Sequence, residues 1–420
     1  MGRRPPRQYR DRLPEGRGRS CEPRVTNDDH HHNDRSGRRP VRVGLAGGSG
    51  FGRVHRANLA RLAEQGSTRL VGVADPAGPP DDLEAGVGHF GSLTDLLAAE
   101  QPEVVIIATP IHTHAVLAEE AFRAGAHVYL EKPPVASMAE YDRLVAVAAE
   151  TGLSCQIGFQ ALGSHALQRI ADLVADGAIG EPRLITGLGV WSRDLAYFNR
   201  SPWSGRRRLD GHQVSDGVAT NALAHSIAQA LRIADVRALD QVKDVRTELY
   251  KANLDNESDD TTWIRVDSDG ALPISVALTL CGPGNDQPPT VSVIGSEGRL
   301  DLQYTIDVLT VDRGGETERL EFDRDDLTEN LLDHCADGAP LISPLTGHAP
   351  YMAVLEAIQA GDPLPLTDDV DVQGTGAQSH PVIKDIERWS RLAAESGEGF
   401  SAVGAPWADP VARSTWFPHR

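Results

Sequence analysis

The chain has 420 residues, more than one ordinary domain holds, and its length predicts two or three domains. Its net charge is −19 and is unevenly spread: residues 1–40 carry eleven Arg and six acidic residues, and the other 30 basic and 54 acidic residues leave a body of −24. Such an acidic body repels phosphate backbones, and no apolar stretch approaches the ~18 residues of a membrane span. The composition therefore argues against a dedicated nucleic-acid binder and a membrane protein.

Residues 1–40 lack apolar periodicity, and we expect this Arg-rich tail to be disordered. The run His30-His31-His32 could bind a metal loosely, but a solvated run is the simpler interpretation, and we expect no metal site. The tail has no apolar segment of the kind found in secretory signals, and the four cysteines show neither metal nor disulfide spacing. We expect a cytoplasmic protein with reduced thiols.

An apolar, β-branched run at residues 41–46 meets a glycine cluster, which is followed by a helical pattern at 53–64 and a second apolar run at 70–74 that ends in Asp75. Strand, glycine turn, helix and strand within about 35 residues predict a βαβ unit of the dinucleotide-binding type.

The glycine turn departs from the usual G-x-G-x-x-G, because Ser49 stands at the middle glycine position between Gly47 and Gly52. We expect the turn to hold a pyrophosphate at the helix N-terminus, where unpaired N–H groups and the helix dipole favour anions. The predicted cofactor contacts here are Gly47, Ser49, Gly50, Phe51 and Gly52. The alternative is a structural turn that binds no phosphate.

Asp75 follows Gly52 by 23 residues, where an acid typically bonds the adenosine ribose hydroxyls. A carboxylate there repels a 2′-phosphate, and no Lys or Arg occurs within residues 76–88 to bind one. The sequence therefore favours NAD over NADP. The alternative is that Asp75 only caps the turn before Pro76.

Short apolar strands and helices continue to alternate up to residue 159, which predicts a doubly wound parallel sheet with its edge near Gly158. The strands are expected at 104–108, 127–130 and 153–159, and the helices at 93–99, 113–124 and 139–150.

After about residue 180, successive strand patterns predict a second domain with a mostly antiparallel open sheet and flanking helices. We expect strands at 183–190, 238–250, 261–266, 273–280, 290–294, 299–304 and 306–311, and helices at 218–232, 327–335, 349–358 and near 382–394. The predicted domains are a Rossmann-like NAD-binding domain at 41–158, an α+β substrate and oligomerisation domain at 159–366, and a C-terminal extension at 367–420.

Lys132 lies in the segment Glu131-Lys132-Pro133, directly after a predicted strand and so beside the ligand crevice of an open α/β sheet. The proline biases Lys132 towards extended backbone. A partly desolvated lysine has a lowered pKa and can exchange a proton, which arginine cannot do. The chain has only four lysines against 37 arginines, which makes a lysine at this position suggestive.

At this point the sequence resembles the glucose–fructose oxidoreductase and inositol dehydrogenase (Gfo/Idh/MocA) family over about residues 41–358. Four motifs carry the resemblance: the glycine turn followed by His55, the loop Ala108-Thr109-Pro110-Ile111-His112-Thr113-His114, the segment Glu131-Lys132-Pro133, and Gly158-Phe159-Gln160. The resemblance implies cofactor contacts by Thr109, Pro110, His114, Glu131 and Lys132, and a substrate contact by Gln160. It also implies a homo-oligomer, a dimer or tetramer, that uses the open sheet face.

Residues 216–225 resemble the family's Asp-x-x-x-His helix, with Asn221 at the Asp position and His225 at the His position. Since the family's Asp and His point at the substrate, the resemblance implies substrate contacts by Asn221 and His225. We expect both side chains on one helix face, because residues i and i+4 share a face. An amide can orient a hydroxyl but cannot ionise, so a carboxylate-tuned proton relay is in doubt here. The alternative for His225 is a satisfied core histidine.

Residues 191–203 mix aromatic, cationic and hydroxyl side chains, which suit a polyhydroxylated ligand. Arg193, Tyr197 and Trp203 are candidate substrate contacts, and an ordered surface loop is the alternative. Together these features predict an NAD-dependent oxidoreductase acting on a sugar, cyclitol or related polyol, with Lys132 and His225 in proton transfer. The alternatives are a non-catalytic, cofactor-binding regulatory member and an imine or enone reductase.

Overall fold

The first sheet of the computed structural model, which describes residues 39–418, has six strands that all run parallel. Their order is β3-β2-β1-β4-β5-β6, so the strand order reverses between β1 and β4. The doubly wound parallel sheet is confirmed, and its switch point lies at the glycine turn that follows β1. The strands are β1 (Val41–Ala46), β2 (Thr68–Ala74), β3 (Gly88–Phe90), β4 (Val104–Ile107), β5 (His127–Leu130) and β6 (Cys155–Ile157).

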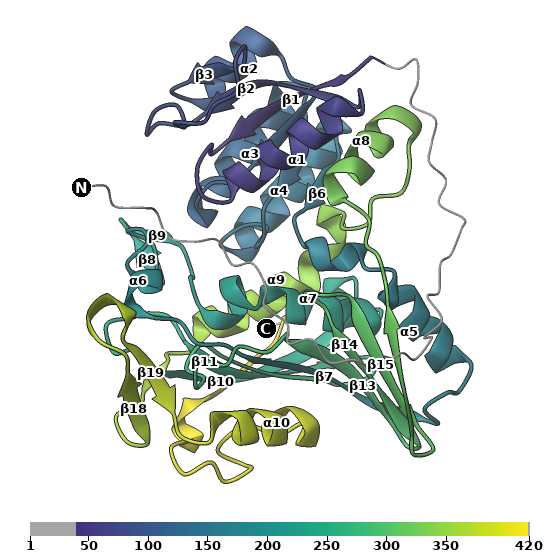
Figure 1. Cartoon of the computed structure of the whole chain (residues 1–420), viewed down its shortest axis with the longest axis vertical. Coiled ribbons are helices and arrows are strands. Elements are labelled where there is room, and N and C mark those ends of the chain that lie inside the picture. The colour runs from purple at the N-terminus through teal and green to yellow at the C-terminus, as the bar shows by residue number, and fades with distance from the viewer. Residues whose placement is uncertain (1–38, 419–420) are drawn as a thin grey trace, which may run out of the picture.

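Helices α1 (Gly52–Glu64), α2 (Leu93–Glu100), α3 (His114–Arg123) and α4 (Met138–Thr151) flank this sheet (Figure 1). Helices α2 and α4 begin where Ser92 and Ser137 accept a hydrogen bond from a main-chain N–H of the first turn. A late helix, α8 (Leu327–Asp337), returns to the same domain. Its Leu327 and Leu331 lie in one apolar cluster with Val43 of β1 and Leu59 of α1.

The second sheet has ten strands and is mostly antiparallel, as expected. Its order is β16-β15-β14-β13-β7-β12-β11-β10-β17, with β20 also paired to β10, and only the pairs β7–β12 and β10–β17 are parallel. Each of the seven predicted strands is present; β16, β17 and β20 were not predicted. The strands are β7 (Pro182–Val190), β10 (Val242–Lys251), β11 (Thr261–Ser268), β12 (Ile274–Thr279), β13 (Thr290–Gly295), β14 (Gly298–Gln303), β15 (Val308–Arg313), β16 (Glu316–Glu321), β17 (Leu364–Pro365) and β20 (Arg413–Trp416).

Helices lie on both faces of the second sheet (Figure 1). Helices α7 (Ala224–Ile233) and α9 (Ala349–Ala360) pack on the face that looks towards the first domain, with α5 (Ala166–Ala175) beside them. Helix α10 (Ile386–Ser396), from the C-terminal extension, packs on the opposite face against β7, β11 and β12. The face that we expected to be open is therefore covered over these strands.

Two predicted helices are wrong in part. The segment predicted as a helix from 218 to 232 starts with a π-helical turn, Val218–Ala222, in which the N–H of Leu223 bonds the carbonyl of Val218; α7 follows only from Ala224. The segment predicted as a helix from 382 begins as strand β19 (His380–Ile383), paired with β18 (Val370–Gln373). Pairing with a neighbouring strand overrides the local helical pattern there.

None of the helices within residues 39–418 has both the length and the apolar character that crossing a membrane requires. The tail predicted to be disordered, with its His30–His32 run, falls almost entirely outside the described residues.

Candidate active site

The glycine turn after β1 is shaped for a close backbone approach. Gly47 has a φ of +87°, and a Cβ there would lie 2.4 Å from the Ala108 carbonyl oxygen; a Cβ at Gly52 would lie 1.9 Å from the Gly47 oxygen. The main-chain N–H groups of Ser49, Gly50 and Phe51 donate no hydrogen bond to the part of the chain that the structure describes. Free N–H groups at the start of α1 fit the predicted pyrophosphate.

Asp75, at the end of β2, is buried and turned back towards the glycine turn. Its Oδ2 accepts a hydrogen bond from the N–H of Gly48 at 3.0 Å, and its Oδ1 accepts one from the N–H of Ala77 at 3.0 Å. The capping role is therefore real, but each carboxylate oxygen has a second lone pair that can receive a ribose hydroxyl.

Two cations from α1 lie near the loop after β2, although that loop contains none. Arg53 and Arg56 both pair with Asp82, and Arg56 is buried. Arg56 is held by Asp82 in a buried position, whereas Arg53 pairs with Asp82 at 3.5 Å and is exposed, so the preference for NAD over NADP stays a prediction.

His114 connects two loops of the site. It is buried; its Nδ1 contacts the Pro133 and Pro134 carbonyl oxygens at 3.0 and 3.1 Å, and its Nε2 contacts the Thr109 oxygen at 2.9 Å. It thus holds the Thr109-Pro110 loop against the segment after Lys132. Its contacts are with main-chain oxygens, so the predicted direct contact with a cofactor stays a prediction, as it does for Thr109 and Pro110.

Glu131 is the centre of a buried polar network. Its Oε1 accepts a hydrogen bond from Gln160 Nε2 at 3.0 Å and contacts His55 Nε2 at 2.9 Å. A Cβ at Gly158 would lie 2.8 Å from the same oxygen. Glu131 therefore ties α1, β5 and the start of the second domain together, which explains why three separate sequence motifs meet here.

Lys132 follows Glu131 at the carboxyl end of β5 and reaches Asn221 in the second domain. Its Nζ donates to Asn221 Oδ1 at 2.7 Å and to the Asn221 main-chain oxygen at 3.0 Å. Burial lowers the pKa of Lys132, the carboxylates of Glu131 and Asp216 act in the opposite direction, and Arg200 lowers it further. The structure thus joins the predicted lysine to the predicted asparagine.

His225 lies in the first turn of α7, packed edge-on against Phe159 with ring centroids 5.6 Å apart. Burial, followed by the positive charge of Lys132, lowers the pKa of His225 to about 3, so the ring is neutral near pH 7. Its Nδ1 is buried and bonds to no group within residues 39–418. Asn221 and His225 do not share a regular helix face, since the π-helical turn ends between them.

The aromatic segment forms a stack of alternating cations and rings around α6 (Leu195–Phe198). Arg193 lies over Trp191 and Tyr197 and pairs with Asp286, while Arg200 lies over Tyr197 and Trp203 at 3.9 and 4.8 Å from the ring centroids. The predicted contacts Arg193, Tyr197 and Trp203 are therefore neighbours in space, and their contact with a substrate stays a prediction.

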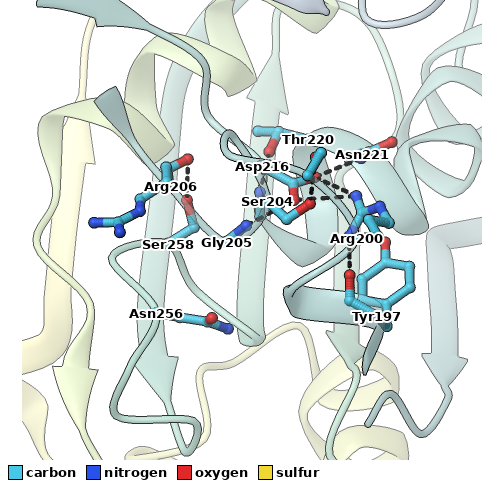
Figure 2. Close-up of polar contacts among 12 residues, drawn as sticks. Tyr197, Arg200, Ser204, Gly205, Arg206, Asp216, Thr220, Asn221, Asn256 and Ser258 are labelled. Carbon is cyan, nitrogen blue, oxygen red and sulfur yellow. Dashed lines mark hydrogen bonds and ion pairs between the residues drawn. The ribbon is translucent and has the colours of Figure 1, made fainter. Parts of the chain in front are cut away.

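Arg200 connects this stack to Asn221 and so to Lys132. The connection runs through Asp216, a residue without a role predicted from the sequence. Arg200 pairs with Asp216 at 3.1 Å, and Asp216 accepts a hydrogen bond from Asn221 Nδ2 (Figure 2). A signal was present, since Asp216 stands next to Gly217 just before the Asn221 segment. Only the folded loop at 200–216 reveals the contact.

Both halves of the chain match models of one family. Residues 41–159 match the model described as "Oxidoreductase family, NAD-binding Rossmann fold", and residues 167–301 match the "GFO/IDH/MocA C-terminal domain", together more than half of the chain. The chain belongs to the GFO/IDH/MocA family. Its first domain is the NAD-binding Rossmann domain of that family, which agrees with the predicted cofactor.

Relatives in this family carry names of dehydrogenases. Inositol 2-dehydrogenase of Rhizobium meliloti (strain 1021) is 32% identical over 158 residues, which cover 37% of this chain and 46% of that enzyme. Inositol 2-dehydrogenase of Rubrobacter xylanophilus is 29% identical over 45% of this chain and 51% of that enzyme. The chain thus matches about half the length of these curated relatives.

The same fold occurs in the WlbA dehydrogenase of Bordetella pertussis, solved in complex with NADH and UDP-GlcNAcA. That structure has a TM-score of 0.63 and 21% identity, and it covers 77% of this chain and 96% of its own. An inositol dehydrogenase homologue of Azotobacter vinelandii, complexed with NADH and myo-inositol, has a TM-score of 0.62 and 17% identity over 77% and 95% of the two chains. Within residues 39–418, no three His, Cys, Asp or Glu side chains form a metal-binding group.

Proposed function

We propose that the protein is an NAD-dependent oxidoreductase that transfers a hydride between nicotinamide and a carbinol carbon of a sugar, cyclitol or related polyol. The observation that carries the proposal is the environment of Lys132. This amine of lowered pKa lies at the carboxyl end of β5, and two oxygens of Asn221 from the second domain hold it. Lys132 thus lies at the carboxyl ends of the parallel strands, where ligands of such folds bind.

In the oxidation direction, the neutral amine of Lys132 would accept the proton of the substrate hydroxyl as the carbinol carbon loses its hydride. NAD, when bound, supplies the hydride acceptor. The products are a carbonyl, a reduced nicotinamide and an ammonium at Lys132, so atoms and charge balance. Reduction reverses each step.

His225 serves as a neutral hydrogen-bonding group beside the lysine. A ring with a pKa of about 3 is not an imidazolium near pH 7, so in this proposal its neutral N–H and lone pair orient the substrate oxygen, and proton exchange is left to Lys132. The sequence predicted that Lys132 and His225 both take part in proton transfer. In this proposal Lys132 alone exchanges the proton, and His225 orients the substrate.

The binding of NAD has separate support. The absence of a Cβ at Gly47 and Gly52 allows a close approach of the pyrophosphate, and the N–H groups of residues 49–51 can bind it. The carboxylate of Asp75 suits a dinucleotide without a 2′-phosphate. The names of the relatives, inositol 2-dehydrogenases among them, support a polyhydroxylated substrate.

The experiment is a screen of the purified protein with NAD+ and a panel of probes: myo-inositol, a neutral hexose, a hexuronic acid and a nucleotide-linked sugar. We expect nicotinamide reduction, seen in its absorbance, with at least one probe. NADP+ in place of NAD+ is expected to give a much weaker rate.

NAD+ binding is measured in parallel by calorimetry. Tight NAD+ binding without turnover on any of the polyols, in either direction, would favour the non-catalytic alternative. Turnover of cyclic imines or enones with none on polyols would favour the reductase alternative.

A further inference from the structure

Asp216 is an almost fully buried carboxylate, with its side chain 3% exposed, at the point where the aromatic segment meets the catalytic lysine. It accepts hydrogen bonds from Asn221 Nδ2 and from the Gly205 N–H, the latter at 2.8 Å, and it pairs with Arg200 at 3.1 Å (Figure 2). A buried charge with this many partners has a fixed position.

The amide of Asn221 bridges Asp216 and Lys132. Its Oδ1 accepts from Lys132 Nζ at 2.7 Å, and its Nδ2 donates to Asp216 Oδ1. In the flipped orientation the NH2 group would face an ammonium and the oxygen would face a carboxylate, and both contacts would be repulsive. The carboxylate of Asp216 therefore determines that the acceptor end of the amide faces the lysine.

This orientation also fixes the lysine nitrogen. Of its four tetrahedral positions, one holds Cε, and two carry N–H groups directed at the two oxygens of Asn221. One position is left, which holds the lone pair in the neutral amine and the third proton in the ammonium. The exchangeable proton is thereby confined to one direction.

We propose that Asp216 is a positioning residue for Lys132, which acts through the Asn221 amide and replaces the carboxylate that Asn221 itself lacks. This inference rests on the proposed function, in which Lys132 exchanges the proton of the reaction. The chain thus separates the contact with the lysine from the negative charge: Asn221 makes the contact, and Asp216 supplies the charge.

The charged groups around the lysine set the direction of each test. The carboxylates of Glu131 and Asp216 raise the pKa of Lys132, whereas burial and Arg200 lower it, and His225 is neutral. Removing the charge of Asp216 should therefore lower the pKa of Lys132, and placing a carboxylate at residue 221 should raise it.

The test is competitive labelling of the full chain with acetic anhydride at a series of pH values, followed by peptide mass spectrometry. Only neutral amines react, and the chain has four lysines, so Lys132 is read against Lys243, Lys251 and Lys384 in one sample. We expect the labelling midpoint of Lys132 to move to lower pH in Asp216→Asn and to higher pH in Asn221→Asp. The midpoint of Lys384 should stay constant.

Asn221→Leu, which breaks the bridge without touching Asp216, is the second variant in case Asp216→Asn fails to fold. It too should lower the Lys132 midpoint. An unchanged midpoint in either folded variant would overturn the proposal. Because labelling needs no substrate, this result is independent of the proposed function, which fails separately if the wild-type chain oxidises no polyol. Where turnover is found, Asp216→Asn should lower kcat for oxidation roughly tenfold at pH values above the Lys132 pKa, where the amine is neutral in both proteins, because the lone pair is no longer held in one direction; NAD+ affinity should stay unchanged.

Discussion

At the residue scale, the site holds two nitrogen bases with different protonation behaviour. His225 is neutral throughout the physiological range, since its pKa is about 3. Burial lowers the pKa of Lys132, and the carboxylates of Glu131 and Asp216 act in the opposite direction. Lys132 is therefore the group whose protonation changes between substrate and product in the proposed reaction.

The pH profile follows from this assignment. Oxidation needs the neutral amine, so kcat for oxidation should rise as pH passes upward through the pKa of Lys132, and kcat for reduction should fall over the same range. His225→Gln should lower kcat without shifting the pH at which kcat rises, because His225 does not titrate in that range. Stopped-flow or steady-state rates over pH measure this midpoint. A shifted midpoint in His225→Gln would contradict the assignment of Lys132 as the titrating group.

The sequence predicted Lys132 from its place directly after a strand of the first sheet, and Asn221 and His225 from the resemblance to the family's Asp-x-x-x-His helix. It did not assign roles to Asp216 and Arg200, whose contacts depend on how residues 200–216 fold back on the site. Long-range contacts between loops leave no periodic trace in a sequence, so this part of the site required the structure.

At the element scale, the glycine turn and the π-helical turn show opposite degrees of predictability. The glycine turn was predicted because a tight strand-to-helix connection demands residues without Cβ. The π-helical turn at Val218–Ala222 was not, because its sequence reads as an ordinary helix. The π-helical turn affects the site, because it separates Asn221 from the helix that carries His225.

Substitutions in the glycine turn should differ sharply. Gly52→Ala places a Cβ 1.9 Å from a main-chain oxygen, so we expect loss of measurable NAD+ binding and a destabilisation of about 1–3 kcal/mol. Gly50→Ala meets no atom within 4 Å and only strains a φ of +54°, so its cost should be about 1 kcal/mol. Calorimetry and thermal unfolding measure the pair, and equal effects of the two would refute the steric reading of the turn.

At the scale of the whole molecule, the C-terminal extension completes the second domain. Trp407 and Phe400 pack on each other and on Tyr250 of β10, and α10 covers the outer face of β7, β11 and β12. The sequence predicted residues 367–420 only as a C-terminal extension, without a position for it; the structure packs it against this sheet. The homo-oligomer stays a prediction. Beside α10, a hollow is lined by polar side chains of β7 (Thr186), β13 (Ser292), β14 (Arg299 and Asp301) and β15 (Thr310), together with Arg391 and Glu395 of α10.

The extension should contribute to global stability. Trp407→Ala empties a buried ring position and should destabilise the protein by about 3–5 kcal/mol. Val411→Ala, in the same segment but 72% exposed, should change stability by less than about 0.5 kcal/mol. Denaturant unfolding of both variants tests whether the extension folds as part of the domain; equally small effects would show that it does not.

The most direct measurement of the central claim is turnover and NAD+ binding by Lys132→Ala, with Lys384→Ala, an exposed lysine, as its control. The proposed chemistry predicts that Lys132→Ala binds NAD+ like the wild type and loses polyol oxidation by roughly 10²-fold or more, while Lys384→Ala keeps both. Wild-type turnover in Lys132→Ala would contradict the assignment of Lys132 as the proton acceptor.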